Sequence, residues 1–186
     1  MIMMRALCLF CGSSAGARPD YLRAARTVGT WLAERKITLV YGGGHVGMMG
    51  AAADAALAAG GKVIGVIPRA LVDRELAHRG VTELRVVGSM HERKALMAEL
   101  SDGFLALPGG IGTFEELFEV LTWSQLGLHG KACAVLNVAG YYDPLLALVD
   151  HAVAEGFLSR RNRKRLLAGK DAGRLLERMG WGAGME

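Results

Sequence analysis

The sequence predicts an α/β fold of the Rossmann-like type, a doubly wound parallel sheet with helices on both faces. Short apolar runs alternate with longer stretches of helical periodicity, which is typical of repeated βα units. Aromatic residues make up only 6% of the chain, whereas it holds 26 glycines. This composition favours helices packed closely on a sheet over an aromatic-rich β-sandwich. Right-handed crossovers between parallel strands then place helices on both faces.

Six apolar runs, most of them closed by a Gly or Pro turn, predict the strands. The first run, ALCLFCG, has the continuous apolar character of a strand buried on both faces. In order along the chain, the predicted strands cover residues 6–12, 38–43, 62–68, 83–88, 103–109 and 132–138.

Helical periodicity fills the segments between these strands. We expect helices that start near Pro19, Val46, Met90, Thr113 and Tyr142, and a last helix from Ala172 to Met179. One start has a specific signal, because Thr113 and Glu116 match a Thr-x-x-Glu capping box. In such a box each side chain bonds a backbone N–H that the helix start leaves free.

A single domain over residues 1–186 is expected, because 186 residues with 52% apolar content suffice for one core and no linker or repeat interrupts the pattern. The segment SRRNRKR concentrates five positive charges in a basic C-terminal tail from about residue 159. We interpret it as a solvated loop and helix face. No aromatic residues are interleaved and the net charge is only +4, so we expect no nucleic-acid partner.

Cysteine usage indicates a reducing compartment, because the three cysteines are an odd number without a disulfide-framework spacing. Cys8 and Cys11 form a C-x-x-C pair, but three residues apart on a strand they point to opposite faces, whereas a redox pair needs a helix start. The stretch MIMMRALCLFCGSSAGA resembles a secretory signal only weakly and serves well as a first core strand. No run approaches the roughly 18 apolar residues of a spanning helix. We therefore expect a soluble cytoplasmic protein without membrane contact.

Gly-rich or polar turns follow five of the predicted strands, and ligands of open parallel sheets bind beyond these carboxyl ends. The turns are CGSS at 11–14, YGGGHVG at 41–47, IPRAL at 67–71, GSMHERK at 88–94 and PGGIGTFEE at 108–116. Together they predict a ligand cleft on one edge of the sheet.

The first glycine turn matches a dinucleotide-binding pattern, because Gly42, Gly44 and Gly47 fit G-x-G-x-x-G between a strand and a helix. The acidic ribose-binding residue expected after the next strand is missing, since that strand runs into Arg69. An arginine there would suit a 2′-phosphate, so a dehydrogenase stays open as a less favoured alternative. The Gly-Lys-Ser/Thr ending of a P-loop is absent from both glycine turns.

The second glycine turn is suited to a phosphate, because Gly109, Gly110 and Gly112 leave room for an oxyanion beside the N–H groups of a helix start. A carboxylate aimed at the phosphate would repel it, so Glu115 and Glu116 are expected to face a neutral or cationic part of the ligand.

A cluster of cations, His91, Arg93 and Lys94, stands at the preceding helix start, where positive charge is unfavourable unless an anion binds. Surface salt bridges with Glu92 or Glu99 are the alternative explanation.

Two other kinds of site are not supported by the sequence. The five histidines lack H-E-x-x-H or any Cys-His ligand spacing, so no metal site is expected. A Ser-His-Asp hydrolase would need a G-x-S-x-G elbow, which the sequence lacks.

The motifs MHERK at 90–94 and PGGIGTFEE at 108–116 resemble those of the Lonely Guy family, the cytokinin riboside 5′-monophosphate phosphoribohydrolases. The resemblance extends over CGSS, YGGGHVGMMG, VIGVIP, TWSQLGLHGK and GYYDPLL, and leaves only the basic tail uncovered. It implies a nucleotide-binding domain that hydrolyses the N-glycosidic bond of a cytokinin riboside monophosphate or AMP-like nucleotide to free base and ribose 5-phosphate. It also implies a homodimer with no metal or organic cofactor. The alternative is a carrier that binds a nucleotide or molybdenum cofactor without hydrolysis, since similar folds occur in such proteins.

The resemblance also implies site residues, which carry over to matching positions. Arg93 and Glu116 correspond to the family's catalytic pair. The implied substrate-binding residues are Glu75, Lys94, Gly110, Ile111, Gly112, Thr113, Phe114, Glu115 and Thr122.

Overall fold

The computed structural model describes residues 5–72, 74 and 77–181 and contains a seven-stranded sheet in the order β4-β3-β2-β1-β5-β6-β7. Every neighbouring pair of strands is parallel. The strand order therefore reverses between β1 and β5, which confirms a doubly wound sheet. The strands are β1 (Ala6–Phe10), β2 (Thr38–Tyr41), β3 (Val63–Pro68), β4 (Glu83–Val87), β5 (Gly103–Ala106), β6 (Ala132–Leu136) and β7 (Leu166–Gly169).

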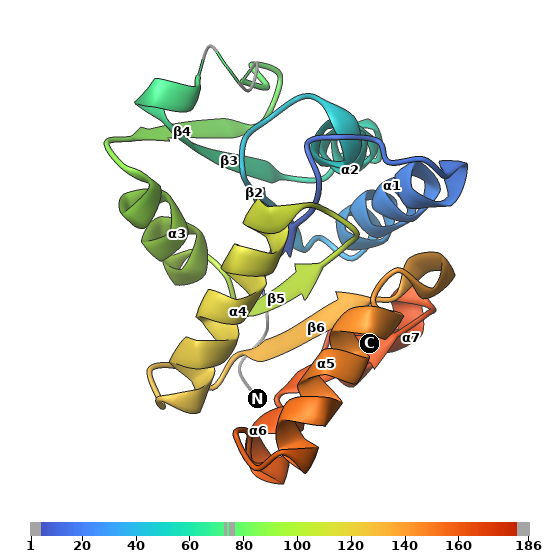
Figure 1. Cartoon of the computed structure of the whole chain (residues 1–186). Coiled ribbons are helices and arrows are strands. Elements are labelled where there is room, and N and C mark those ends of the chain that lie inside the picture. The colour runs from blue at the N-terminus through green and yellow to red at the C-terminus, as the bar shows by residue number, and fades with distance from the viewer. Residues whose placement is uncertain (1–4, 73, 75–76, 182–186) are drawn as a thin grey trace.

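Helices cover both faces of the sheet, as Figure 1 shows for α1 and α2 on one side and α3 and α4 on the other. The helices are α1 (Pro19–Glu34), α2 (Gly47–Ala58), α3 (Met90–Glu99), α4 (Ile111–Gln125), α5 (Asp143–Ala154), α6 (Arg160–Arg163) and α7 (Ala172–Arg178). Two short 3-10 helices, η1 (Arg69–Leu71) and η2 (Val138–Gly140), follow β3 and β6. None of the described helices combines the length and the hydropathy needed to cross a bilayer.

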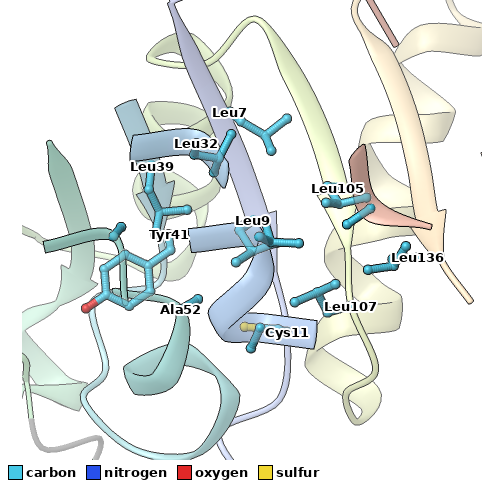
Figure 2. Close-up of a cluster of buried hydrophobic side chains, with 14 of the residues drawn as sticks. Leu7, Leu9, Cys11, Leu32, Leu39, Tyr41, Ala52, Leu105, Leu107 and Leu136 are labelled. Atoms are coloured by element: carbon cyan, nitrogen blue, oxygen red, sulfur yellow. The ribbon is translucent and has the colours of Figure 1, made fainter. Parts of the chain in front are cut away.

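The central strand β1 is buried throughout and divides the core into two clusters. Leu7 and Leu9 pack on the α1, α2 and α7 side, together with Cys11 (Figure 2). Cys8 packs on the α3, α4 and α5 side. The two cysteines therefore point to opposite faces, as expected, and both are free thiols.

All six predicted strands are confirmed, with carboxyl ends that are up to three residues shorter than predicted. The seventh strand, β7, was not predicted. It lies in the segment from residue 159, where α6, β7 and α7 follow one another and β7 pairs with β6.

The predicted capping box at Thr113 is wrong. Helix α4 begins two residues earlier, at Ile111 after the N-cap Gly110, so the Thr113 side chain lies inside the first turn. A box-like start exists instead at α3, where the Ser89 hydroxyl accepts a hydrogen bond from the Glu92 N–H and the Glu92 carboxylate accepts one from the Gly88 N–H.

Candidate functional site

A cleft of about 320 Å³ opens at the point where the strand order reverses. The ends of β1 and β2 and the starts of α3 and α4 line it. Seven of the residues predicted for the site lie in this lining: Arg93, Gly110, Ile111, Gly112, Thr113, Glu115 and Glu116. The volume is in the range of small-ligand pockets.

Arg93 lines this cleft, with only 6% of its surface exposed. Its Nε donates to the Val66 carbonyl at 3.2 Å and its Nη2 to the Gly42 carbonyl at 3.0 Å. These acceptors belong to β3 and to the turn after β2, so the guanidinium crosses from α3 to the carboxyl end of the sheet. Arg93 is therefore a buried side chain that bonds to backbone carbonyls, whereas the sequence alone allowed an exposed one.

The start of α4 exposes backbone N–H groups at the cleft. None of the described side chains caps this helix, and its N-terminal turn carries the positive end of the helix dipole. A Cβ added at Gly110 or Gly112 would meet nothing within 4 Å, whereas one at Gly109 would lie 2.1 Å from the Thr113 Oγ1. Packing therefore requires glycine at position 109 but not at positions 110 and 112.

Glu116 lies one turn into α4 and is partly buried where that helix faces the end of β1. Burial, and in addition the negative charge of Glu116, raises the pKa of the Cys8 and Cys11 thiols above its ordinary value. These thiols consequently stay protonated and are poor nucleophiles. Two carboxylates, Glu115 and Glu116, line the cleft, and Glu115 is paired with Lys94.

Lys94, Phe114 and Thr122 are predicted site residues that lie outside the cleft lining. The Lys94 ammonium forms ion pairs with Glu115 and, at 3.0 Å, with Glu119, so its partners are not the Glu92 or Glu99 considered from the sequence.

The other two residues have contacts of their own on α4. Phe114 stacks on Tyr141 with ring centroids 6.4 Å apart. Thr122 is exposed about 16 Å along α4 from its start, by helix rise, and its hydroxyl donates to the Phe118 carbonyl at 2.7 Å. Glu75 lies outside the described residues.

The G-x-G-x-x-G pattern has structural reasons that do not involve a dinucleotide. A Cβ at Gly42 would lie 2.1 Å from the Arg93 Nη2, and one at Gly47 would lie 2.3 Å from the Ser13 carbonyl oxygen. Gly47 also has a φ of +60°, which favours glycine. Gly42 thus makes room for Arg93, and Gly47 makes room for the turn after β1.

Several lining residues were not predicted individually as site residues, among them Gly12, Met49 and Met90, and Gly42 was considered only for a dinucleotide. The glycines stood within turns that the sequence analysis marked as the edge of the cleft. Met90 likewise stood within one of these turns, whereas Met49 is buried and resembled an ordinary core residue. The described part of the chain holds no group of three or more His, Cys, Asp or Glu residues suited to a metal ion.

Comparisons with known proteins show which family this chain resembles. A family model described as "Possible lysine decarboxylase" matches residues 49–179. The "Probable cytokinin riboside 5'-monophosphate phosphoribohydrolase" of Oryza sativa subsp. japonica is 53% identical over 94% of this chain and 77% of the relative. The cytokinin riboside 5'-monophosphate phosphoribohydrolase of Rhodococcoides fascians is 52% identical over 90% of this chain and 85% of the relative.

Solved structures share the architecture at much lower identity. The molybdenum cofactor binding protein from Rippkaea orientalis is similar with a TM-score of 0.71 at 20% identity, over 97% of this chain and 98% of that one. The molybdenum cofactor carrier protein from Chlamydomonas reinhardtii has a TM-score of 0.69 at 19% identity, over 95% of this chain and 96% of that one. At these identities the similarity concerns the fold alone.

Proposed function

The chain belongs to the Lonely Guy family, and from this premise we propose that it is a nucleoside 5′-monophosphate phosphoribohydrolase. The substrate is a cytokinin riboside 5′-monophosphate or an AMP-like nucleotide. Water cleaves its N-glycosidic bond, and the products are the free base and ribose 5-phosphate.

The observation that carries this proposal is the meeting of Arg93, Glu116 and the uncapped start of α4 in one cleft. A site that only binds a nucleotide needs the phosphate-binding backbone. Such a binding site has no need for a partly buried carboxylate such as Glu116, one turn further along α4. A glycosidase needs a carboxylate at its reacting bond.

In the mechanism that we propose, the 5′-phosphate docks on the N–H groups of Gly110 to Thr113 and thereby holds the ribose C1′ near Glu116. Cleavage develops oxocarbenium-like positive charge on the sugar, which the carboxylate stabilises while it aligns or deprotonates the attacking water. Arg93 holds ribose or phosphate oxygens from the floor of the cleft.

The Lys94 ion pairs give Glu115 a different role from that of Glu116. Since Lys94 is held between Glu115 and Glu119, the three side chains fix α3 against α4 and so set the distance between Arg93 and Glu116. We propose this support as the reason why Lys94 and Glu115 belong to the site.

The decisive experiment is incubation of the purified protein with AMP and, separately, with isopentenyladenosine 5′-monophosphate. Chromatography should detect the free base and ribose 5-phosphate in equal amounts. Binding of either nucleotide without release of base would instead identify a carrier, and no binding at all would refute both functions.

We further propose a homodimer that forms through the C-terminal half of α4 and the turn that follows it. Phe118 of α4 is 39% exposed, and Leu126 and Leu128 just beyond the helix are 67% and 70% exposed, which is apolar area that a second copy would cover. Sedimentation at micromolar concentration should give a dimer, and Leu126→Glu with Leu128→Glu should give a monomer. Phe157→Glu, at an exposed apolar residue beyond the end of α5, is the matched control and should leave the dimer intact. A monomeric wild type would contradict the proposal.

We also propose that the protein is located in a reducing compartment such as the cytoplasm. It is supported by Cys8, Cys11 and Cys133, which are all free thiols in the core.

A further inference from the structure

The turn before α4 has three successive carbonyl groups, and each accepts a hydrogen bond from a residue distant in the sequence. The Leu107 carbonyl accepts from the Tyr142 hydroxyl at 2.7 Å, and the Pro108 carbonyl accepts from the Gly12 N–H at 3.1 Å. The Gly109 carbonyl accepts from the Tyr141 hydroxyl. The backbone that leads into the phosphate-binding turn is therefore held at every peptide.

The first of the two tyrosines to consider, Tyr142, is itself held by residues on either side of η2. The Tyr142 side chain is fully buried, and its N–H donates to the Asn137 Oδ1 at 2.8 Å. Asn137 in turn donates to the Asp143 carboxylate at 2.6 Å. Burial raises the pKa of Tyr142, so its hydroxyl remains a donor.

Tyr141 is held by ring contacts. It meets Tyr21 edge to face with ring centroids 5.8 Å apart, and it stacks on Phe114 of α4. It thus connects α1, the turn and the first turn of α4.

The orientation of a peptide carbonyl decides where the neighbouring N–H points, because both belong to one planar unit. When the carbonyls of Leu107 to Gly109 are held by the residues that follow η2 and β1, the chain enters α4 in one orientation. The N–H groups from Gly110 onward then stay at the cleft, where no described side chain caps them. A glycine-rich turn without such bonds would sample several orientations.

We propose that Tyr141 and Tyr142 are positioning residues, whose hydroxyl groups hold the glycine turn so that the start of α4 is preorganised for the substrate phosphate. This role rests on the proposed function. The tyrosines touch no reacting atom and act only through the backbone of the turn. The ligand group that this turn binds is a phosphate monoester.

The test uses Tyr141→Phe and Tyr142→Phe in the full chain, with Tyr21→Phe as the matched control. Tyr21 belongs to the same aromatic group, but its hydroxyl bonds to no described residue. Spectra of ligand-free protein labelled with ¹⁵N-glycine report on Gly109, Gly110 and Gly112. Calorimetry then measures affinity for ribose 5-phosphate and for adenosine, which lacks the phosphate.

The two variants should shift or broaden the signals of the turn glycines and leave those of Gly65 and Gly103 in the sheet unchanged. Each should weaken ribose 5-phosphate binding about fivefold, the loss expected from one hydrogen bond, while adenosine affinity changes less than twofold. Tyr21→Phe should change neither.

Unchanged glycine signals, or equal losses for both ligands, would overturn the proposal. Tyr141→Phe decides the case if Tyr142→Phe does not fold, because Tyr141 is only partly buried. If the wild type neither hydrolyses AMP nor binds ribose 5-phosphate, the proposed function fails, whereas glycine signals that shift in the variants would still support the positioning of the turn.

Discussion

The Arg93 guanidinium occupies the space that a side chain at position 42 would need. Its Nη2 donates to the Gly42 carbonyl at 3.0 Å and would lie 2.1 Å from a Cβ built on Gly42. Glycine at the end of β2 and arginine at the start of α3 are therefore one structural unit, although 51 residues separate them.

Gly42→Ala should consequently displace Arg93 and lower kcat/KM for AMP. Loss of one preorganised charged donor from a reacting site reduces the rate by about a hundredfold or more, and Arg93→Ala should match this loss and weaken nucleotide binding. The double variant should be no worse than Arg93→Ala alone, because the truncated side chain at position 93 leaves room for the methyl group introduced at position 42. Steady-state kinetics on all three variants measures this coupling.

The matched control for that series is Gly130→Ala, at a glycine where a Cβ would meet nothing within 4 Å. It should keep wild-type kinetics. Additive losses in the double variant would contradict the structural link between Gly42 and Arg93.

Glu116→Gln should lower kcat by roughly a hundredfold and leave nucleotide affinity nearly unchanged. The amide keeps the shape of the carboxylate but cannot accept a proton or stabilise positive charge on the sugar, whereas the phosphate is bound mainly by backbone groups. Glu115→Gln is the neighbouring control, because that carboxylate pairs with Lys94 and should matter less for turnover. If the folded Glu116→Gln variant hydrolysed AMP at the wild-type rate, Glu116 would not be the catalytic carboxylate.

Stability should fall as the pH drops below about 6.5, in part because of His129. Its Nδ1 accepts from the Lys131 N–H at 3.1 Å and its Nε2 donates to the Val120 carbonyl at 2.9 Å, an arrangement that suits the neutral ring. Burial lowers the pKa of His129, and the charges of Lys131 and Arg165 lower it further against the effect of the Val120 bond. The unfolded chain therefore takes up the proton first as the pH falls, and the folded state loses stability.

Thermal unfolding between pH 7.5 and 5 measures the His129 contribution. His129→Gln does not titrate, so its stability should depend less steeply on pH than that of the wild type. His151→Gln, at an exposed histidine of α5, should retain the wild-type slope. Equal slopes for all three proteins would remove His129 from the explanation.

Most of the fold could be predicted because each buried strand is a continuous apolar run, and such runs are visible without any knowledge of pairing. Strand β7 could not, since its four residues directly follow a run of basic residues. It is a strand because its backbone pairs with β6 at the sheet edge, from Cys133 opposite Leu166 onward. That pairing is a tertiary contact, and no local pattern encodes it.

The candidate site was predicted by its motifs but not by its contacts. A charged side chain at a helix start resembles an exposed one, and the burial of Arg93 depends on carbonyls 27 and 51 residues away. Lys94 likewise finds Glu115 and Glu119 at separations of 21 and 25 residues. Motif spacing identifies which side chains share an edge of the sheet, whereas packing decides which of them face the ligand.

Gly112→Ala should separate stability from binding most clearly. Position 112 lies in α4, and a Cβ there would meet nothing within 4 Å. Alanine should therefore leave the free energy of unfolding unchanged or raise it by at most about 1 kcal/mol, and the melting temperature should not fall. If a phosphate docks there, the methyl group occupies its approach, and overlap of this kind costs about 1–3 kcal/mol. Nucleotide binding should then weaken roughly fivefold or more. Gly109→Ala should do the reverse and mainly destabilise the fold, because its Cβ would lie 2.1 Å from the Thr113 Oγ1 and 2.9 Å from the Gly12 nitrogen. Calorimetric melting and AMP titration of both variants test the pair, and a Gly112→Ala protein that binds AMP as tightly as the wild type would show that the phosphate docks elsewhere.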